Sequence, residues 1–242
     1  MNRSKIEWCD YTWNPVTGCW GPQGTAEKAN WCSYCYALRV AQRFSPFEKT
    51  GYVQLKNQGI NNDPFQPLFW PDRLDQPAKV KKPSKVFVCS MADLFGDWVP
   101  SEWILDVLAV VRACPQHTFQ FLTKNPKRLS LWNGTWPSNC WVGTTVTNQA
   151  DADERVPWLN RADASIKFIS HEPLLGPITN GLIFYPVHWA IIGAQTGPGA
   201  VKPKLEWVRT LWEQYRQAGV PIFLKNNLKP IMGTLVQEWP NH

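Results

Sequence analysis

From residue 84 onward the chain alternates between two kinds of segment, and this alternation limits the possible fold more than any other feature. Six short runs rich in Val, Ile, Phe and Thr occupy residues 85–90, 118–124, 140–146, 166–172, 189–195 and 221–226. Such runs are typical of strands buried on both faces. Helix-like stretches, among them residues 101–114 and 204–219, separate several of the runs. The pattern predicts a parallel α/β sheet, either open and doubly wound or a closed or partial barrel.

Length and composition argue against a membrane-spanning or secreted protein. The 242 residues suit one large domain or two small ones, and the 44% hydrophobic content allows a sizeable core. No stretch approaches the roughly 18 unbroken apolar residues of a membrane span, and the first ten residues hold no apolar run typical of a secretion signal. We therefore expect a cytoplasmic protein with no membrane partner, in which thiols stay reduced.

The charge balance is mildly basic. The formal net charge is +6, and the densest basic run is residues 79–85. A solvated linker is the first interpretation of this run, and a patch that faces phosphates is the second. The 15 tryptophans could pack a core or stack on bases and sugars. These features are compatible with a nucleic-acid partner and do not require one.

Polar side chains follow every one of the six predicted strands. They are Cys89, Ser90 and Asp93, then Thr123 and Lys124, then Thr144, Thr145, Thr147 and Asn148, then His171 and Glu172, then Gln195, and last Lys225 and Asn226. The active sites of α/β barrels and open α/β sheets lie at the carboxyl ends of the strands. The same residue types also favour caps and loops. Their recurrence at six strand ends favours a functional site.

Three cysteines stand together near the N-terminus, ahead of a predicted helix. Cys32 and Cys35 form a CxxC pair, and twelve residues separate Cys19 from that pair. Structural zinc takes four ligands, and Cys9 could supply the fourth. An iron–sulfur cluster held by only three cysteines keeps one iron open for a ligand. The cysteines alone leave zinc, a cluster and plain buried thiols as alternatives.

The residues around these cysteines resemble the radical S-adenosylmethionine (AdoMet) superfamily, whose signature is three cysteines with an aromatic residue before the last. Here that aromatic residue is Tyr34. The chain is still more similar to the phage-associated family with a three-cysteine motif. The matching segments are "WNPVTGC" (13–19), "CYA" (35–37), "VFVCSMADLF" (86–95), "FLTK" (121–124), "EPLLGPI" (172–178) and "WAIIGAQTG" (189–197).

Three features depart from these families. The superfamily usually has three residues between its first two cysteines, whereas this chain has twelve. Gln195 stands where the phage-associated family tends to have Glu. Residues 225–228 read "KNNL" where that family tends to have "KQWG".

The resemblance implies a partial (β/α) barrel of about six or seven parallel strands with an N-terminal cysteine loop. It also implies a [4Fe–4S] cluster that cleaves AdoMet reductively to a 5′-deoxyadenosyl radical, which abstracts hydrogen from a substrate. An external one-electron donor would supply the electron. The cofactors carry the difficult chemistry, and the protein binds and orients them.

The same resemblance implies roles for individual residues. Cys19, Cys32 and Cys35 would ligate the cluster. The residues that would bind AdoMet are Tyr34 at the adenine, Ser90 and Asp93 at the ammonium, Lys124 at the carboxylate, Thr145 and Asn148 at the ribose, and Glu172 and Gln195 elsewhere in the cavity. Cys89 is a candidate hydrogen donor, as in the spore photoproduct lyase branch, or a small core residue.

The resulting expectation is a single domain that spans residues 1–242. Residues 1–45 would hold the cluster, 46–83 would form an irregular insertion, 84–228 would form the repeated βα units, and 229–242 would be a tail. Nucleic acid is the candidate substrate. The alternative is a zinc-stabilised, non-catalytic nucleic-acid-binding module.

Overall fold

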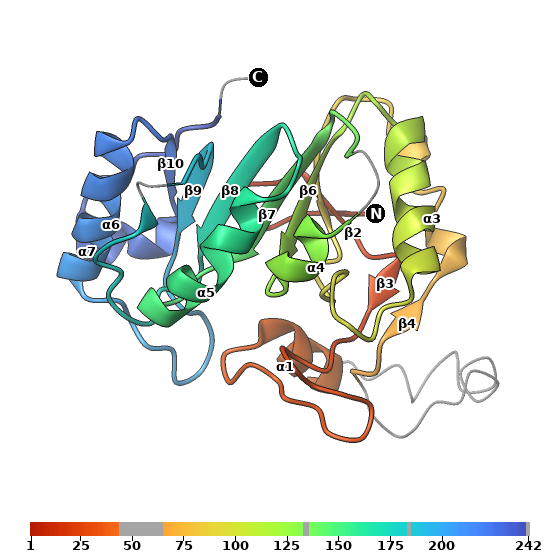
Figure 1. Ribbon diagram of the computed structural model, residues 1–242, viewed down its shortest axis with the longest axis horizontal. Helices are drawn as coiled ribbons and strands as arrows, with labels where there is room; N and C mark the ends of the chain where they lie inside the picture. The colour runs from red at the N-terminus through yellow and green to blue at the C-terminus, as the bar shows by residue number, and fades with distance from the viewer. Residues whose placement is uncertain (44–64, 133–135, 183–184, 241–242) are drawn as a thin grey trace.

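The computed structural model describes residues 1–43, 65–132, 136–182 and 185–240. Its centre is an eight-stranded sheet in the order β1-β2-β5-β6-β7-β8-β9-β10 (Figure 1). The strands are β1 Asn2–Arg3, β2 Tyr11–Trp13, β5 Lys85–Val88, β6 Thr118–Thr123, β7 Cys140–Thr145, β8 Ile166–His171, β9 Trp189–Ile192 and β10 Ile222–Leu224. Every neighbouring pair from β2 to β10 is parallel, whereas β1 runs antiparallel to β2.

The order of the strands decides between the two predicted architectures. From β2 to β10 the order in the sheet equals the order in the chain, so the sheet winds in one direction, as in a barrel, and has no point at which the order reverses. Within the described residues, β10 does not pair with β1 or β2. The prediction of a partial (β/α) barrel is therefore confirmed, with seven parallel strands.

The seventh parallel strand, β2, lies outside the six runs from which strands were predicted. Residues Tyr11–Trp13 pair with β5, and the amide of Cys89 donates a hydrogen bond of 2.8 Å to the carbonyl oxygen of Trp13. A strand of three residues is too short for alternation to be recognised in the sequence. Its existence depends on β5, about 75 residues later in the chain.

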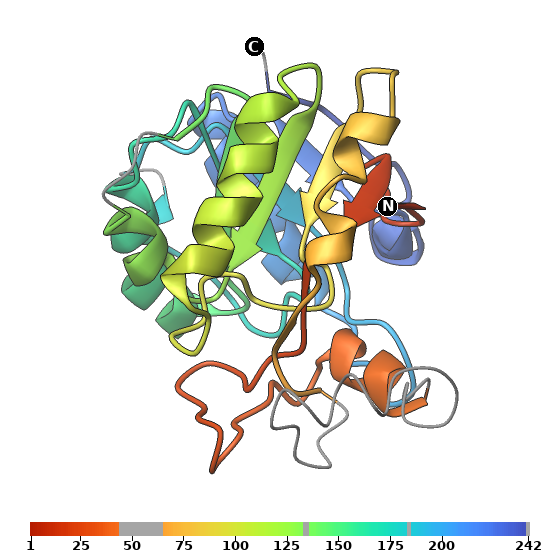
Figure 2. The same cartoon turned by 90° about the vertical axis from the view of Figure 1, so that its right-hand side faces the viewer.

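The helices lie outside the sheet. They are α1 Tyr36–Arg43, α3 Ser101–Ala113, α4 Pro126–Ser130, α5 Gln149–Asn160, α6 Leu205–Gln217 and α7 Lys229–Met232. Figure 2 shows α3 along the outer face of the sheet. Its buried residues Ile104, Val107, Leu108 and Val111 recur at helical spacing. Both helices expected at residues 101–114 and 204–219 are present, and Gly219 adopts the left-handed conformation (φ 67°) that ends a helix.

Each strand places alternate residues on opposite faces. Along β7, Cys140 and Val142 pack toward the helices, whereas Trp141 points into the barrel. The barrel interior is a separate hydrophobic cluster. It consists of Trp8, Cys9, Phe87, Trp141, Ile166, Phe168, Trp189, Ile191 and Phe223. Gly143 leaves space there for Phe168, because a Cβ atom on this glycine would lie 2.7 Å from the Phe168 ring.

The segment predicted as a tail has a structural role. Phe223 of β10 bridges antiparallel to Gln237, and the amide of Leu224 donates a 2.7 Å hydrogen bond to the carbonyl oxygen of Val236. The Trp239 ring stacks on Trp189 with centroids 4.9 Å apart. The C-terminal segment therefore covers the aromatic barrel interior, which corrects the description of residues 229–242 as a tail.

The insertion predicted at residues 46–83 falls partly outside the described residues. Its remainder contains the 3-10 turns Pro71–Arg73 and Pro77–Lys79 and β4 (Leu68–Phe69), which pairs with β3 (Val16–Thr17). A third 3-10 turn spans Asn226–Leu228. No helix in the described part of the chain has the length and apolarity that a membrane span requires.

Candidate active site

A cavity of about 300 Å³ lies at the carboxyl ends of the strands and is lined in part by the cysteine loop and the start of α1. Figure 1 shows α1 below the sheet. The cavity brings together nearly all the site residues predicted from the sequence. Its lining includes Cys19, Cys32, Tyr34, Cys35, Cys89, Ser90, Asp93, Lys124, Thr145, Glu172 and Gln195. Asn148 does not belong to this lining; its side chain caps α5 by accepting a 3.0 Å hydrogen bond from the amide of Asp151.

Alternation along the strands decides which strand-end residues enter the cavity. Lys124, Thr145 and Glu172 continue the inward-facing rows of β6, β7 and β8 and line the cavity. His171 points the other way. Its ring nitrogens contact the carbonyl oxygen of Val146 (2.8 Å) and the hydroxyl of Tyr215 (2.7 Å), and burial lowers its pKa to about 4. His171 is therefore a core residue of the helix-facing side.

Cys89 and Ser90 are neighbours in sequence, yet both line the cavity. Strand alternation would send them to opposite faces. Cys89 adopts the left-handed conformation (φ 57°), which is unusual for a residue other than glycine and interrupts the alternation where β5 ends. Burial raises the pKa of the Cys89 thiol to about 12, so it stays protonated at neutral pH.

Asp93 is held in place by the end of β6. Its carboxylate accepts hydrogen bonds from the Thr123 hydroxyl (2.6 Å) and the amide of Lys124 (2.8 Å). Ser90 donates a 3.2 Å bond to the side-chain oxygen of Asn14. Asn14 also accepts a bond from the amide of Met91. Asn14 was not among the predicted site residues, although it belongs to the "WNPVTGC" segment.

Lys124 is the cation that faces the cysteine loop. Its Nζ lies 5.8 Å from the centroid of the Tyr34 ring, a distance typical of a cation–π contact. Burial lowers the pKa of Lys124, but the acidic groups around it, led by Tyr34 and Cys32, raise that pKa overall. Among the described residues, Lys124 forms no ion pair. It therefore offers a positive charge to an anionic ligand.

The three cysteines of the loop face one cavity, and two of their sulfurs accept backbone hydrogen bonds. The amide of Gly21 donates to Cys19 Sγ (3.2 Å), and the amide of Leu38 donates to Cys35 Sγ (3.3 Å). Burial raises the pKa of the free Cys19 thiol to about 12. No group of three or more His, Cys, Asp or Glu side chains in the described ranges has the spacing of a metal site. The three cysteine thiols are the ligand type that an iron–sulfur cluster requires, and binding of a cluster would draw them together.

Cys9, the fourth ligand of the zinc alternative, lies elsewhere. It is a member of the barrel-interior cluster and donates a 3.1 Å hydrogen bond to the Ser4 hydroxyl. Cys9 does not belong to the lining of the cavity that the other three cysteines share. It packs in the barrel interior, and this location counts against a zinc site built from four cysteines.

Two contacts hold α1 over the cavity, and neither was predicted. The Tyr36 hydroxyl donates a hydrogen bond to the carbonyl oxygen of Ser90. Arg39 donates a 2.9 Å bond to the carbonyl oxygen of Thr196, beyond the end of β9. These contacts join the helix that follows the cysteine pair to two separate strand ends.

Glu172 and Lys225 form an ion pair across the ends of β8 and β10. A Cβ atom on Gly193 would lie 2.9 Å from the Lys225 side chain and 3.3 Å from that of Glu172, so this glycine provides room for the pair. Gln195 accepts a 3.1 Å bond from the amide of Val201 and thereby orders its own loop.

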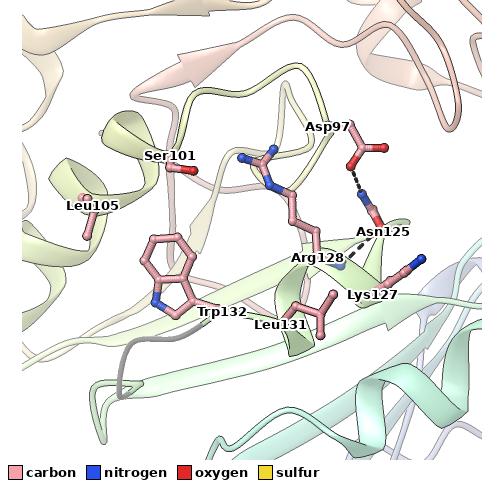
Figure 3. A pocket seen from close by; sticks show the side chains of 8 residues that line it. All are labelled: Asp97, Ser101, Leu105, Asn125, Lys127, Arg128, Leu131 and Trp132. Atoms are coloured by element: carbon pink, nitrogen blue, oxygen red, sulfur yellow. Dashed lines mark hydrogen bonds between the residues drawn. The ribbon is translucent and has the colours of Figure 1, made fainter.

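A second, more open hollow of about 700 Å³ lies between α3 and α4 (Figure 3). In it, the side chain of Asn125 donates to Asp97 (2.8 Å), and Arg128 donates to the backbone carbonyl oxygens of Gly96 and Val99. None of the predicted site residues lines this hollow. The smaller cavity, which contains the thiols, is therefore the candidate active site.

The fold is similar to that of spore photoproduct lyase. One structure, complexed with a dinucleoside spore photoproduct, has a TM-score of 0.57 and 11% identity and covers 93% of this chain and 79% of its own. A variant of that lyase with a dinucleoside spore photoproduct has a TM-score of 0.51, 12% identity and coverages of 97% and 63%. A further variant, with bound AdoMet and the same photoproduct, has a TM-score of 0.50, 12% identity and coverages of 90% and 53%. The chain thus spans between about half and four fifths of these structures.

At such low identity the likeness concerns the fold, which agrees with the partial barrel described above. No curated protein sequence matches the chain. One family model covers almost its whole length, from residue 3 to residue 231. The chain belongs to the family described as "Protein of unknown function (DUF5131)".

Proposed function

We propose that the protein is a radical AdoMet enzyme. The observation that carries this proposal is the shared cavity, in which three thiols and the cation Lys124 meet at the carboxyl ends of a partial barrel. A lyase with a similar fold holds AdoMet, which supports the assignment. The finer resemblance to the phage-associated three-cysteine family is part of the proposal and rests on sequence motifs alone.

Cys19, Cys32 and Cys35 would hold a [4Fe–4S] cluster. Such a cluster, when bound, supplies an open iron for the amino and carboxylate groups of AdoMet and the electron that cleaves its carbon–sulfur bond, with an external donor as the source of that electron. The chain binds and orients these groups and excludes water from the site.

The predicted roles of the lining residues agree with their environment. Lys124 would neutralise the carboxylate of AdoMet, because its charge has no ion-pair partner among the described side chains. Asp93 and Ser90 would receive the ammonium group, and the bonds from Thr123 and Lys124 keep the Asp93 carboxylate oriented for this. Tyr34 would contact the adenine and Thr145 the ribose. For Asn148, Glu172 and Gln195 the contacts described above are structural, and their roles toward AdoMet stay predictions.

Cys89 would donate a hydrogen atom to a carbon radical of the substrate. It belongs to the lining of the cavity, and its raised pKa keeps the S–H bond that such a transfer requires. The transfer forms a C–H bond and leaves a sulfur radical. An electron from the external donor and a proton would then restore the thiol.

Nucleic acid remains the candidate substrate, since the lyase of similar fold binds a dinucleoside. The basic run at residues 79–85 does not support this choice. It precedes β5 at the amino end of the sheet, whereas the cavity lies at the carboxyl end. In this region Lys79 pairs with Asp75, and Lys85 lies over the ring of Trp239. These contacts favour the linker interpretation.

Anaerobic reconstitution with iron and sulfide tests the proposal. We expect a brown protein with about four irons per chain. After reduction it should convert AdoMet slowly to 5′-deoxyadenosine without any substrate. A colourless protein that binds one zinc and leaves AdoMet intact would contradict the proposal and favour the zinc-stabilised module.

A further inference from the structure

Two buried polar atoms in the lining of the cavity have no hydrogen-bond partner among the described residues. They are Nε1 of Trp8 and Oγ of Ser170. Trp8 is 2% exposed and Ser170 is 1% exposed. Buried polar groups are nearly always hydrogen-bonded, so two such atoms in one cavity indicate a ligand that completes them.

The indole of Trp8 is held rigidly in this position. Its ring lies 4.6 Å from the Phe87 ring and 6.4 Å from the Phe168 ring, between centroids. The side-chain amide of Gln120 donates a 3.2 Å hydrogen bond to the carbonyl oxygen of Trp8. The Trp8 ring therefore forms a fixed, flat boundary between the cavity and the aromatic interior of the barrel.

Charge divides the cavity into two sides. On the β5–β6 side, Lys124 has no ion-pair partner within the described part of the chain. On the β8–β10 side, Glu172 and Lys225 neutralise each other. Ser170 belongs to β8, so it lies on this second side. Trp8 contacts Phe87 of β5 and Phe168 of β8, so its indole lies between the two sides. A ligand group bound between Trp8 and Ser170 meets a hydroxyl and an indole N–H beside a paired charge, which together favour an uncharged group.

We infer that the Trp8 and Ser170 side of the cavity recognises the substrate, and that the group it takes is a nucleobase. An indole N–H can only donate, so the ligand must present an acceptor to Trp8, whereas the Ser170 hydroxyl can donate or accept. The N–H lies in the plane of the indole, so the ligand meets the edge of the Trp8 ring. An uncharged planar ring with acceptors and donors on its edge satisfies all of these requirements. This inference rests on the proposed function, in which the other side of the cavity holds AdoMet.

Matched variants test this inference. Trp8→Phe keeps the aromatic ring and removes the N–H, and Ser170→Ala removes the hydroxyl. Trp132→Phe is the control, because Trp132 is another indole whose buried Nε1 has no partner among the described residues, and it lines the separate hollow between α3 and α4. The probes are uridine, cytidine, adenosine, guanosine and a dipeptide amide. Their binding is measured by titration calorimetry, with and without the reconstituted cluster.

We expect the wild type to bind at least one nucleoside and both cavity variants to bind it roughly five- to tenfold more weakly. The Trp132→Phe control should bind nucleoside normally and cleave AdoMet at the unstimulated rate. Equal nucleoside affinity in all the proteins, or absence of nucleoside binding, would overturn the inference while AdoMet cleavage still upheld the proposed function. Binding of the dipeptide amide alone, dependent on Trp8, would replace the nucleobase with a peptide. Loss of AdoMet cleavage in the wild type would contradict the proposed function instead.

Discussion

The two ends of the barrel contain inward-facing residues from the same strands, yet the side chains at the two ends are of opposite kinds. At the amino end, Trp141 and Trp189 fill the interior, and Trp239 covers it. At the carboxyl end, Thr145 lies four residues after Trp141 on β7, and it lines a cavity together with Glu172, which follows β8. Position along a strand therefore decides whether an inward-facing side chain contributes to stability or to the site, as in complete α/β barrels.

This comparison predicts that substitutions at the carboxyl end abolish function and leave the fold intact, whereas those at the amino end destabilise the fold. The cysteines give the largest expected effect. Cys32→Ala should remove the cluster and all AdoMet cleavage, because it removes one of three ligands. Cys9→Ala, in the barrel interior, should keep both. Iron content and 5′-deoxyadenosine formation are the measurements. Loss of iron from the Cys9 variant would contradict the expected difference between the two ends of the barrel.

At the amino end, Trp189→Ala should lower the free energy of unfolding by about 3–5 kcal/mol. The substitution removes a fully buried ring, its stacking on Trp239 and its 2.9 Å hydrogen bond to the carbonyl oxygen of Glu238. Urea unfolding measures the loss. The folded fraction should still bind AdoMet normally, and a stable variant with impaired binding would show that the two ends are not independent.

At the carboxyl end, Lys124→Met should weaken AdoMet binding roughly tenfold or more, since a charge-assisted contact is lost. Its stability should not fall, because burial of the charge is no longer required. Equilibrium dialysis on reconstituted protein gives the affinity. Lys127→Met is the control, since Lys127 is exposed on α4 and lies outside the cavity. Equal affinities of the two variants for AdoMet would show that Lys124 does not bind AdoMet.

His171 concerns the helix-facing side, and its expected effect appears only when the pH is lowered. Burial lowers its pKa to about 4 in the folded protein, against about 6.5 when unfolded. The unfolded chain therefore binds this proton first, and stability falls as the pH drops from about 6.5 toward 4. Unfolding should cost roughly 2 kcal/mol less at pH 5 than at pH 7 through this residue. His171→Gln should lose that part of the pH dependence, as urea titrations at both pH values would reveal.

Much of the fold could be predicted because strands β5–β10 and helices α3 and α6 carry their own periodicity. Much of the site could be predicted because the cysteine pair and the polar strand ends are local patterns. Lys124 and Glu172 were found in this way, but His171 was grouped with them. The alternation that separates Glu172 from His171 was present in the sequence and could have been applied to the strand ends.

The sequence by itself determined the parallel α/β class, the six main strands and the three thiols, because each depends on neighbouring residues. Only the tertiary structure decided the rest. β2 exists through its pairing with β5, and residues 234–239 are ordered through β10. Trp8 and Ser170 meet one cavity from segments about 160 residues apart. Ser90 lines it together with Cys89 because the left-handed backbone at Cys89, which no residue preference predicts, interrupts the alternation. Such features arise from contacts between distant segments, and these contacts form only when the barrel assembles.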